Sequence, residues 1–189
     1  MGISKILRSS LHWGDVCISN IRLAFYRFLY KDSIKFGVNF RCANIEFSLN
    51  PYDSKIIFGD DVQIRKNAVF RTGRNARVVI GKGSFFNQNF SLNALCGITI
   101  GDNSIFGEDV KIYDHNHGYK NKGTLIQDQE YSMAQVFIGN NCWIGSNVVI
   151  LKGVRIGDNC VIGANSVIFK DIPPNSLVKS ETKLVINPF

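Results

Sequence analysis

Two of the chain's three histidines, His115 and His117, lie either side of a single residue in the polar stretch KIYDHNHGYKNKG. An imidazole, with an ordinary pKa of about 6.5, can accept a proton from a hydroxyl at neutral pH or ligate a metal ion. The pair therefore has three interpretations: a general base with a supporting residue, a metal site, or a polar loop that happens to contain histidine. Asp114 could orient one of the rings or be a solvated turn residue.

The sequence around the pair repeats every six residues, which fits neither an amphipathic helix nor a simple alternating strand. It is typical of a coil of three short faces with about eighteen residues per turn, whose equivalent residues stack about 4.8 Å apart. From Ile138 the hexads read IGNNCW, IGSNVV, ILKGVR, IGDNCV, IGANSV and IFKDIP. Upstream they read FGDDVQ and IRKNAV from Phe58, IGKGSF and FNQNFS from Ile80, and IGDNSI, FGEDVK and IYDHNH from Ile100.

Two features depart from this frame. The hexads stop after IYDHNH and resume at Ile138, which predicts a projecting loop over residues 118–137 with both histidines at its root. Trp143 occupies the sixth hexad position, where a side chain should point outward, so this indole predicts a ligand or partner surface. Cys142 and Cys160 occupy the small fifth position and are expected in the core.

Composition predicts one folded domain of 189 residues, with 45% hydrophobic and 20% charged residues. The formal charge of +7 attracts polyanions, but no nucleic-acid motif accompanies it, and nucleic acid is not an expected partner. The five cysteines are odd in number and lack zinc-site spacing, which favours reduced thiols. With neither a signal peptide nor a spanning segment evident, a cytoplasmic location is expected.

The domain organisation follows from the repeat. We expect an N-terminal helical segment over residues 1–33, an all-β solenoid over 34–176 and a C-terminal tail over 177–189. The N-terminal segment is basic and aromatic. It could cap the open end of the solenoid against edge pairing, or lie peripherally on an anionic membrane surface at the inner face of the membrane.

The run NNCWIGSNVVILKGVRIGDNCVIGANSVIFKDIPPNS, from Asn140 to Ser176, resembles the bacterial hexapeptide-repeat acyltransferases. The resemblance is to the galactoside, maltose and capsule or lipopolysaccharide O-acetyltransferases and to the streptogramin acetyltransferases, and it covers about residues 58–176. It implies a left-handed parallel β-helix, a homotrimer with active sites between subunits, and acetyl-CoA as co-substrate with no metal. Handedness rests on the resemblance alone, since parallel crossovers generally take the opposite hand.

The resemblance also implies roles for particular residues. A histidine at the end of its hexad acts as general base on the acceptor hydroxyl, which places this role on His117, with His115 as the competitor. Asn87 and Phe85 match acceptor-binding positions. The acidic pair that galactoside-type enzymes carry slightly later is replaced by SLNAL, which argues against a simple galactoside or maltose acceptor. The positions that match the coenzyme A groove are Trp143, Ser146, Ala164, Lys170 and, in the tail, Lys183.

The function expected from these residues is O-acetylation of a surface polysaccharide, its sugar precursor or a lipid-linked glycan. Acetylation of an antibiotic of streptogramin type or of an amino sugar is the enzymatic alternative. A metal enzyme of carbonic anhydrase type needs three histidine ligands, and with His12 in the N-terminal segment no third ligand is evident. A non-enzymatic scaffold is the remaining alternative.

Overall fold

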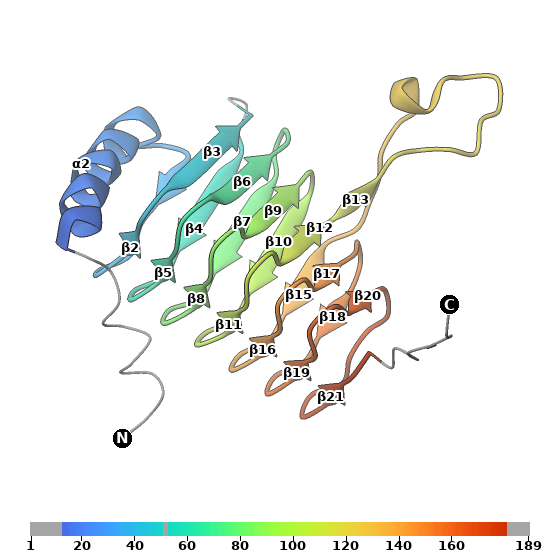
Figure 1. Ribbon diagram of the computed structural model, residues 1–189. Coiled ribbons are helices and arrows are strands. Elements are labelled where there is room, and N and C mark those ends of the chain that lie inside the picture. Colours follow the sequence, from blue (N-terminus) through green and yellow to red (C-terminus); the bar gives the residue numbers. More distant parts are fainter. Residues whose placement is uncertain (1–12, 51–52, 181–189) are drawn as a thin grey trace, which may run out of the picture.

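The computed structural model describes residues 13–50 and 53–180, with side chains of the N-terminal helix from Ile21 onward. Three parallel sheets form the sides of a prism-shaped coil (Figure 1). Sheet A contains, in spatial order, β1 (Ile34–Lys35), β4 (Lys55–Phe58), β7 (Arg77–Ile80), β10 (Gly97–Ile100), β15 (Val136–Ile138) and β18 (Arg155–Ile156).

The other two sheets run alongside it. Sheet B contains β2 (Arg41–Cys42), β5 (Gln63–Ile64), β8 (Phe85–Phe86), β11 (Ile105–Phe106), β16 (Trp143–Ile144), β19 (Val161–Ile162) and β21 (Leu177–Val178). Sheet C contains β3 (Ile45–Leu49), β6 (Ala68–Thr72), β9 (Ser91–Ala94), β12 (Lys111–Tyr113), β17 (Val149–Ile150) and β20 (Val167–Ile168). The predicted solenoid is confirmed and is consistent with a left-handed β-helix. Because β21 joins sheet B, the coil continues two residues into the segment predicted as tail.

The strand register follows the hexads. Trp143 pairs with Val161, and Ile144 pairs with Ile162, so each residue lies beside the one eighteen positions later. The fourth position of these hexads has a positive φ angle, for example 53° at Asn141, 58° at Asn147 and 80° at Gly153. Asparagine and glycine tolerate this left-handed conformation, which explains their recurrence at the corners.

The first hexad position points into the coil, where the largest buried side chains are phenylalanines. Phe86 is fully buried and its ring stacks on that of Phe106, with centroids 4.7 Å apart and an interplanar angle of 8°. Cys142 and Cys160 are also buried, as their fifth position predicts. The core is therefore a continuous column that runs along the coil axis.

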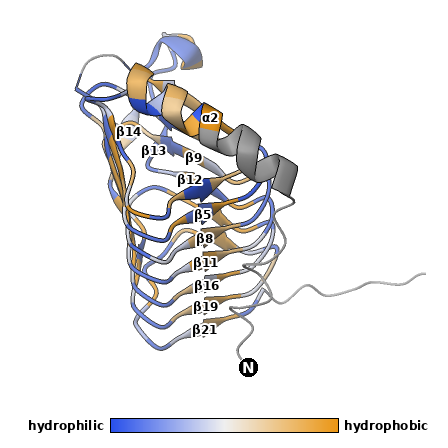
Figure 2. Cartoon of the chain, turned by 90° about the vertical axis from the view of Figure 1, so that its left-hand side faces the viewer, coloured by the Kyte–Doolittle hydropathy of each residue, from blue (hydrophilic) through white to orange (hydrophobic). Residues whose placement is uncertain are grey.

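Helix α2 (Trp13–Leu29) lies across one end of the coil (Figure 2). Leu23, a residue of the helix that packs on the core, is only 7% exposed. The Tyr26 hydroxyl donates to the Ile45 carbonyl oxygen at 2.7 Å, and the Tyr26 ring meets the Phe47 ring edge-on at 5.2 Å. The helix thus covers the apolar end of the core over the first turn. Within the described part of the chain, no helix has the length and apolar character needed to cross a bilayer.

Truncation of the phenylalanine column tests this view of the core. Phe86→Ala is expected to lower the free energy of unfolding by about 3–5 kcal/mol, because it removes a fully buried ring from a close-packed column. Denaturant-induced unfolding followed by circular dichroism measures the change. Phe169→Ala is the matched control, since Phe169 is 66% exposed, and its effect should stay within about 0.5 kcal/mol. Equal losses in the two variants would contradict the assigned core.

Candidate functional site

The loop that carries the histidines leaves the coil at the corner between sheets C and A. After β12, the short strand β13 (His115–Asn116) pairs antiparallel with β14 (Ser132–Met133), and β15 resumes sheet A at Val136. The loop contains one short 3-10 helix, η1 (Ile126–Asp128), and projects away from the prism (Figure 1). The chain therefore leaves the coil at His115 and rejoins it at Val136. The loop begins and ends slightly earlier than the predicted range of 118–137.

Asp114 lies at the root of this loop and is fully buried. One carboxylate oxygen accepts the backbone N–H of Leu95 at 2.8 Å; the other accepts those of Cys96 at 2.8 Å and Gly97 at 2.7 Å. Its own carbonyl oxygen accepts the N–H of Ala134, just after β14, at 2.8 Å. Asp114 is thus not a solvated turn residue: it ties the loop root to the preceding turn of the coil.

A second consequence concerns the neighbouring thiol. Burial, together with the Asp114 carboxylate beside it, raises the pKa of Cys96 to about 11. A thiol with this pKa remains protonated at neutral pH, and the thiolate is the nucleophilic form of cysteine. Cys96 therefore does not supply a nucleophile to the loop root.

His115 is held by the same carboxylate. Its Nδ1 lies 3.0 Å from Asp114 Oδ1, and its side chain is 18% exposed. The ring of Tyr131 meets the His115 ring edge-on at 5.3 Å. With Nδ1 on the carboxylate and an aromatic ring against it, His115 has a defined orientation, so the structure pairs Asp114 with His115.

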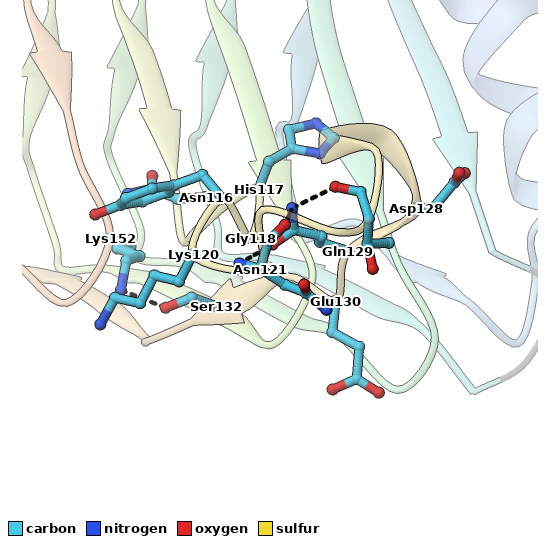
Figure 3. A pocket seen from close by; sticks show the side chains of 12 residues that line it. Asn116, His117, Gly118, Lys120, Asn121, Asp128, Gln129, Glu130, Ser132 and Lys152 are labelled. Carbon is cyan, nitrogen blue, oxygen red and sulfur yellow. Dashed lines mark hydrogen bonds between the residues drawn. The ribbon is translucent and has the colours of Figure 1, made fainter.

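His117 is exposed at the mouth of a hollow of about 680 Å³ (Figure 3). Its ring packs against the Tyr131 ring, with 4.6 Å between the centroids. Lys152, from the coil, also lines the hollow and donates from Nζ to the Ser132 hydroxyl oxygen at 2.8 Å. The two histidines therefore share Tyr131 as a neighbour, but only His117 opens onto the hollow.

A second group of predicted residues lies on the outward row of sheet B. Phe85, Ile105, Trp143 and Val161 are successive register partners, so their side chains stack along one face of the coil. Trp143 is 55% exposed, as its hexad position predicts. The expected acceptor residue Phe85 and the expected donor residue Trp143 therefore share one apolar row.

Asn87, Ser146 and Ala164 lie at the corner where this row meets sheet C. The N–H of Asn165 donates to the Ser146 carbonyl oxygen at 2.9 Å, which stacks Ser146 and Ala164 in adjacent turns. The Ser146 hydroxyl accepts the Glu108 N–H at 3.2 Å. Asn87 lies at the same corner, two turns nearer the helix end of the coil than Ser146.

Lys170 lies at a different corner. It follows β20 of sheet C and occupies the same place in its turn as Lys152 in the turn before, because Ile150 pairs with Ile168. Lys170 is thus grouped with the loop root and not with Ser146 and Ala164. Lys183 lies outside the described residues.

The predicted residues therefore form two groups on opposite sides of sheet C. Asp114, His115 and His117 lie at the corner with sheet A; Trp143 and Ser146 lie on sheet B or its corner with sheet C. The six residues that cross the face between these corners can span up to roughly 20 Å. Proton transfer to a reacting group needs a contact of about 3 Å. Within one chain, the width of sheet C therefore separates the two groups.

Tyr131 is the contact that the sequence does not predict. It lies in the loop, outside the hexad frame, and no spacing relates it to the histidines sixteen and fourteen residues earlier. Among the described residues, no group of three His, Cys, Asp or Glu side chains could hold a metal ion. His12 lies outside those residues.

The chain is similar to proteins of known type. A family model described as "Bacterial transferase hexapeptide (six repeats)" matches residues 135–170. The galactoside O-acetyltransferase of Escherichia coli (strain K12) is 38% identical over 117 residues, which cover 62% of this chain and 56% of that protein. A putative lipopolysaccharide biosynthesis O-acetyl transferase of the same strain, WbbJ, is 30% identical over 152 residues, which cover 72% of this chain and 74% of WbbJ.

Solved structures agree with these matches. A maltose O-acetyltransferase from Clostridium difficile 630 superimposes with a TM-score of 0.52 at 28% identity, over 92% of this chain and 75% of that one. AntD, an N-acyltransferase from Bacillus cereus, superimposes with a TM-score of 0.59 over 82% of this chain and 80% of that one. Its identity is 18%, so this likeness concerns the fold alone. The chain spans little more than half of the galactoside relative's length.

The buried carboxylate at the loop root can be tested by an isosteric change. Asp114→Asn leaves one acceptor oxygen for three backbone N–H groups, so at least one buried donor loses its partner. We expect a loss of at least about 1–3 kcal/mol in the free energy of unfolding, measured by denaturant titration. His115→Ala is the control, because it removes the ring contact and keeps all three backbone bonds. A larger loss for His115→Ala would contradict the role given to Asp114.

Proposed function

The chain belongs to the bacterial hexapeptide-repeat transferase family, and from this premise we propose that it transfers acetyl from acetyl-CoA to a hydroxyl of a surface polysaccharide, its sugar precursor or a lipid-linked glycan. The observation that carries the proposal is His117, an exposed imidazole at the mouth of a hollow beside a rigid loop root. The names of the relatives support acetyl as the transferred group and a carbohydrate as the acceptor.

In the proposed reaction, His117 accepts the proton of the acceptor hydroxyl as the hydroxyl oxygen attacks the acetyl carbonyl carbon. The carbon–sulfur bond breaks, and the proton passes from His117 to the departing sulfur, which leaves an acetyl ester and free coenzyme A. A positioned base of this kind contributes roughly 10²- to 10⁴-fold. Alignment of the two substrates supplies a further part of the acceleration.

The loop root gives this base a fixed support. Asp114 orients His115, and the Tyr131 ring contacts both histidines, so a displaced His115 would alter the packing around His117. We assign His115 and Asp114 as positioning residues and His117 as the residue that touches the acceptor. An imidazole held by packing on one side loses little freedom when substrate arrives, which favours catalysis by orientation.

The donor and acceptor are proposed to bind along sheet B. The exposed Trp143 and the small Ser146 and Ala164 leave a corner along which the pantetheine arm of acetyl-CoA can extend. Asn87 and Phe85, two turns away, are proposed to contact the acceptor sugar. Lys170 and Lys183 are proposed to meet coenzyme phosphates. Because Lys170 lies at the corner between sheets C and A, away from Ser146 and Ala164, it would do so from the neighbouring subunit's coil.

The separation of the two groups supports a homotrimer with sites between subunits. The outward row of sheet B exposes Ile105, Trp143 and Leu177, an apolar surface suited to a second copy. A neighbouring copy can place its histidine loop against this row, which one chain cannot do for itself.

The cysteines bear on location. Four of them are free thiols: Cys42, Cys96, Cys142 and Cys160. Free thiols are in keeping with the reducing cytoplasm, where we place the protein.

Removal of the proposed base tests the assignment of His117. His117→Ala is expected to lower acetyl transfer by roughly 10²- to 10⁴-fold, whereas coenzyme A affinity stays nearly unchanged because the binding corner is on sheet B. Labelled acetyl-CoA with a panel of glycans, their sugar precursors, amino sugars and a streptogramin measures transfer, and calorimetry measures binding. Should His115→Ala alone abolish turnover, His115 is the base. A drug or amino sugar as best acceptor would overturn glycan O-acetylation.

Mixing two inactive variants tests the site between subunits. His117→Ala and Trp143→Ala lie in the two separate groups, so trimers reassembled from equal amounts of both should contain about one quarter intact sites. We expect activity to recover to about that fraction after mixing and refolding, and not after mixing without subunit exchange. No recovery, with assemblies of wild-type mass, would show that each site is built within one chain.

A further inference from the structure

The outward face of α2 carries an apolar stripe that the coil leaves largely exposed. Its members follow helical spacing and are all more than half exposed: Ile21 (74%), Phe25 (57%), Phe28 (81%) and Leu29 (52%). At 100° per residue they cover about 100° of the helix surface. The opposite side packs on the coil through Leu23, Tyr26 and Tyr30. The stripe is therefore an addition to the helix that the core does not require.

Basic residues border this stripe. Arg22 follows Ile21 on the helix and donates to the Asn44 side-chain oxygen at 3.1 Å, and the exposed Lys31 comes two residues after the helix ends. Between residues 21 and 49 the charges are Arg22, Arg27, Lys31, Lys35 and Arg41 against Asp32 and Glu46. Glu46 is paired with Arg71 of the next turn at 3.2 Å. This end of the coil thus combines exposed apolar side chains with an excess of positive charge.

We propose that this stripe docks the protein on an anionic lipid surface, with α2 lying in the plane of the headgroups. Apolar side chains on one helix face, bordered by Lys and Arg, are the features by which a helix lies in a membrane interface. The side chains of Phe25 and Phe28 would enter the boundary between headgroups and acyl chains. The bordering cations would meet lipid phosphates, each contributing about 1 kcal/mol near an anionic surface.

Charge decides between a lipid surface and a second copy of this chain. Two stripes packed against each other would bring Arg22, Arg27 and Lys31 of one copy near the same residues of the other. Like charges at such an edge oppose association. A leaflet with anionic lipids supplies the opposite sign. The apolar row of sheet B, on the side of the coil, is also a separate surface from the coil end.

The proposed trimer would strengthen this docking. Parallel coils place three copies of α2 at one end of the assembly, and three linked contacts bind far more tightly than one. This step rests on the proposed function, whereas the stripe on each chain does not. Docking and acetyl transfer therefore need separate measurements.

Flotation of the full chain with vesicles tests the proposal. We expect binding to vesicles of phosphatidylcholine mixed with phosphatidylglycerol and little binding to phosphatidylcholine alone. Raising the salt from about 0.1 M to 1 M, which shortens the Debye length from about 10 Å to about 3 Å, should weaken the binding. Equal binding to neutral and anionic vesicles would overturn the role of the basic border.

Matched variants separate the stripe from the border. Phe25→Ser with Phe28→Ser should weaken vesicle binding at least about tenfold, and Lys31→Gln with Lys35→Gln roughly fivefold per charge. Phe169→Ser, equally exposed but at the far end of the coil, should bind like the wild type. Acetyl transfer to a soluble acceptor should stay unchanged in the phenylalanine pair and lysine pair variants, so loss of docking and loss of catalysis are distinguishable.

Two results would overturn the proposal. One is undiminished flotation of the Phe25→Ser, Phe28→Ser variant, with a thermal midpoint like that of the wild type. The other is a smaller assembly mass for this variant in light scattering, because the stripe would then be a contact between copies of the chain.

Discussion

The structure depends on one constraint: each turn of the coil must place inward side chains on inward side chains of the turn before. Ile100 pairs with Ile138 although 38 residues separate them, and Ile144 pairs with Ile162 eighteen residues later. The loop between β12 and β15 can exist only because the chain returns to the same register. Asp114 secures the departure through Leu95, Cys96 and Gly97, and its carbonyl secures the return through Ala134.

This constraint explains why the fold was predictable from the sequence. A side chain that must repeat its environment every eighteen residues leaves a period in the sequence, and left-handed corners add asparagine or glycine at the fourth hexad position. The outward Trp143 and the buried Cys142 follow from the same frame. The helix at the end of the coil was expected from composition. Its division into an apolar side that packs on the coil and a second, exposed apolar side was not, because the sequence alone does not show which side the coil covers.

The candidate site was less accessible to sequence reasoning. The burial of Asp114 was missed because a polar residue beside a loop usually lies in water, and its backbone partners come from the previous turn. Tyr131 was missed because it has no place in the hexad frame. The separation of Lys170 from Ser146 and Ala164 could have been found by counting. Ser146 and Ala164 differ by eighteen residues and share a corner, whereas Lys170 follows Ala164 by six and lies one corner farther on.

The same arithmetic relates the two proposed surfaces to each other. In sheet C the order β3, β6, β9, β12 places the histidine loop three turns from the first turn, or about 14 Å along the axis at 4.8 Å per turn. The helix adds about half its diameter, roughly 5 Å. A protein docked through α2 would therefore hold His117 roughly 20 Å above the headgroups. A sugar attached directly at the lipid surface would not reach that height, whereas the outer residues of a longer lipid-linked glycan would. Docking at this end would thus select among the acceptors proposed here by their length.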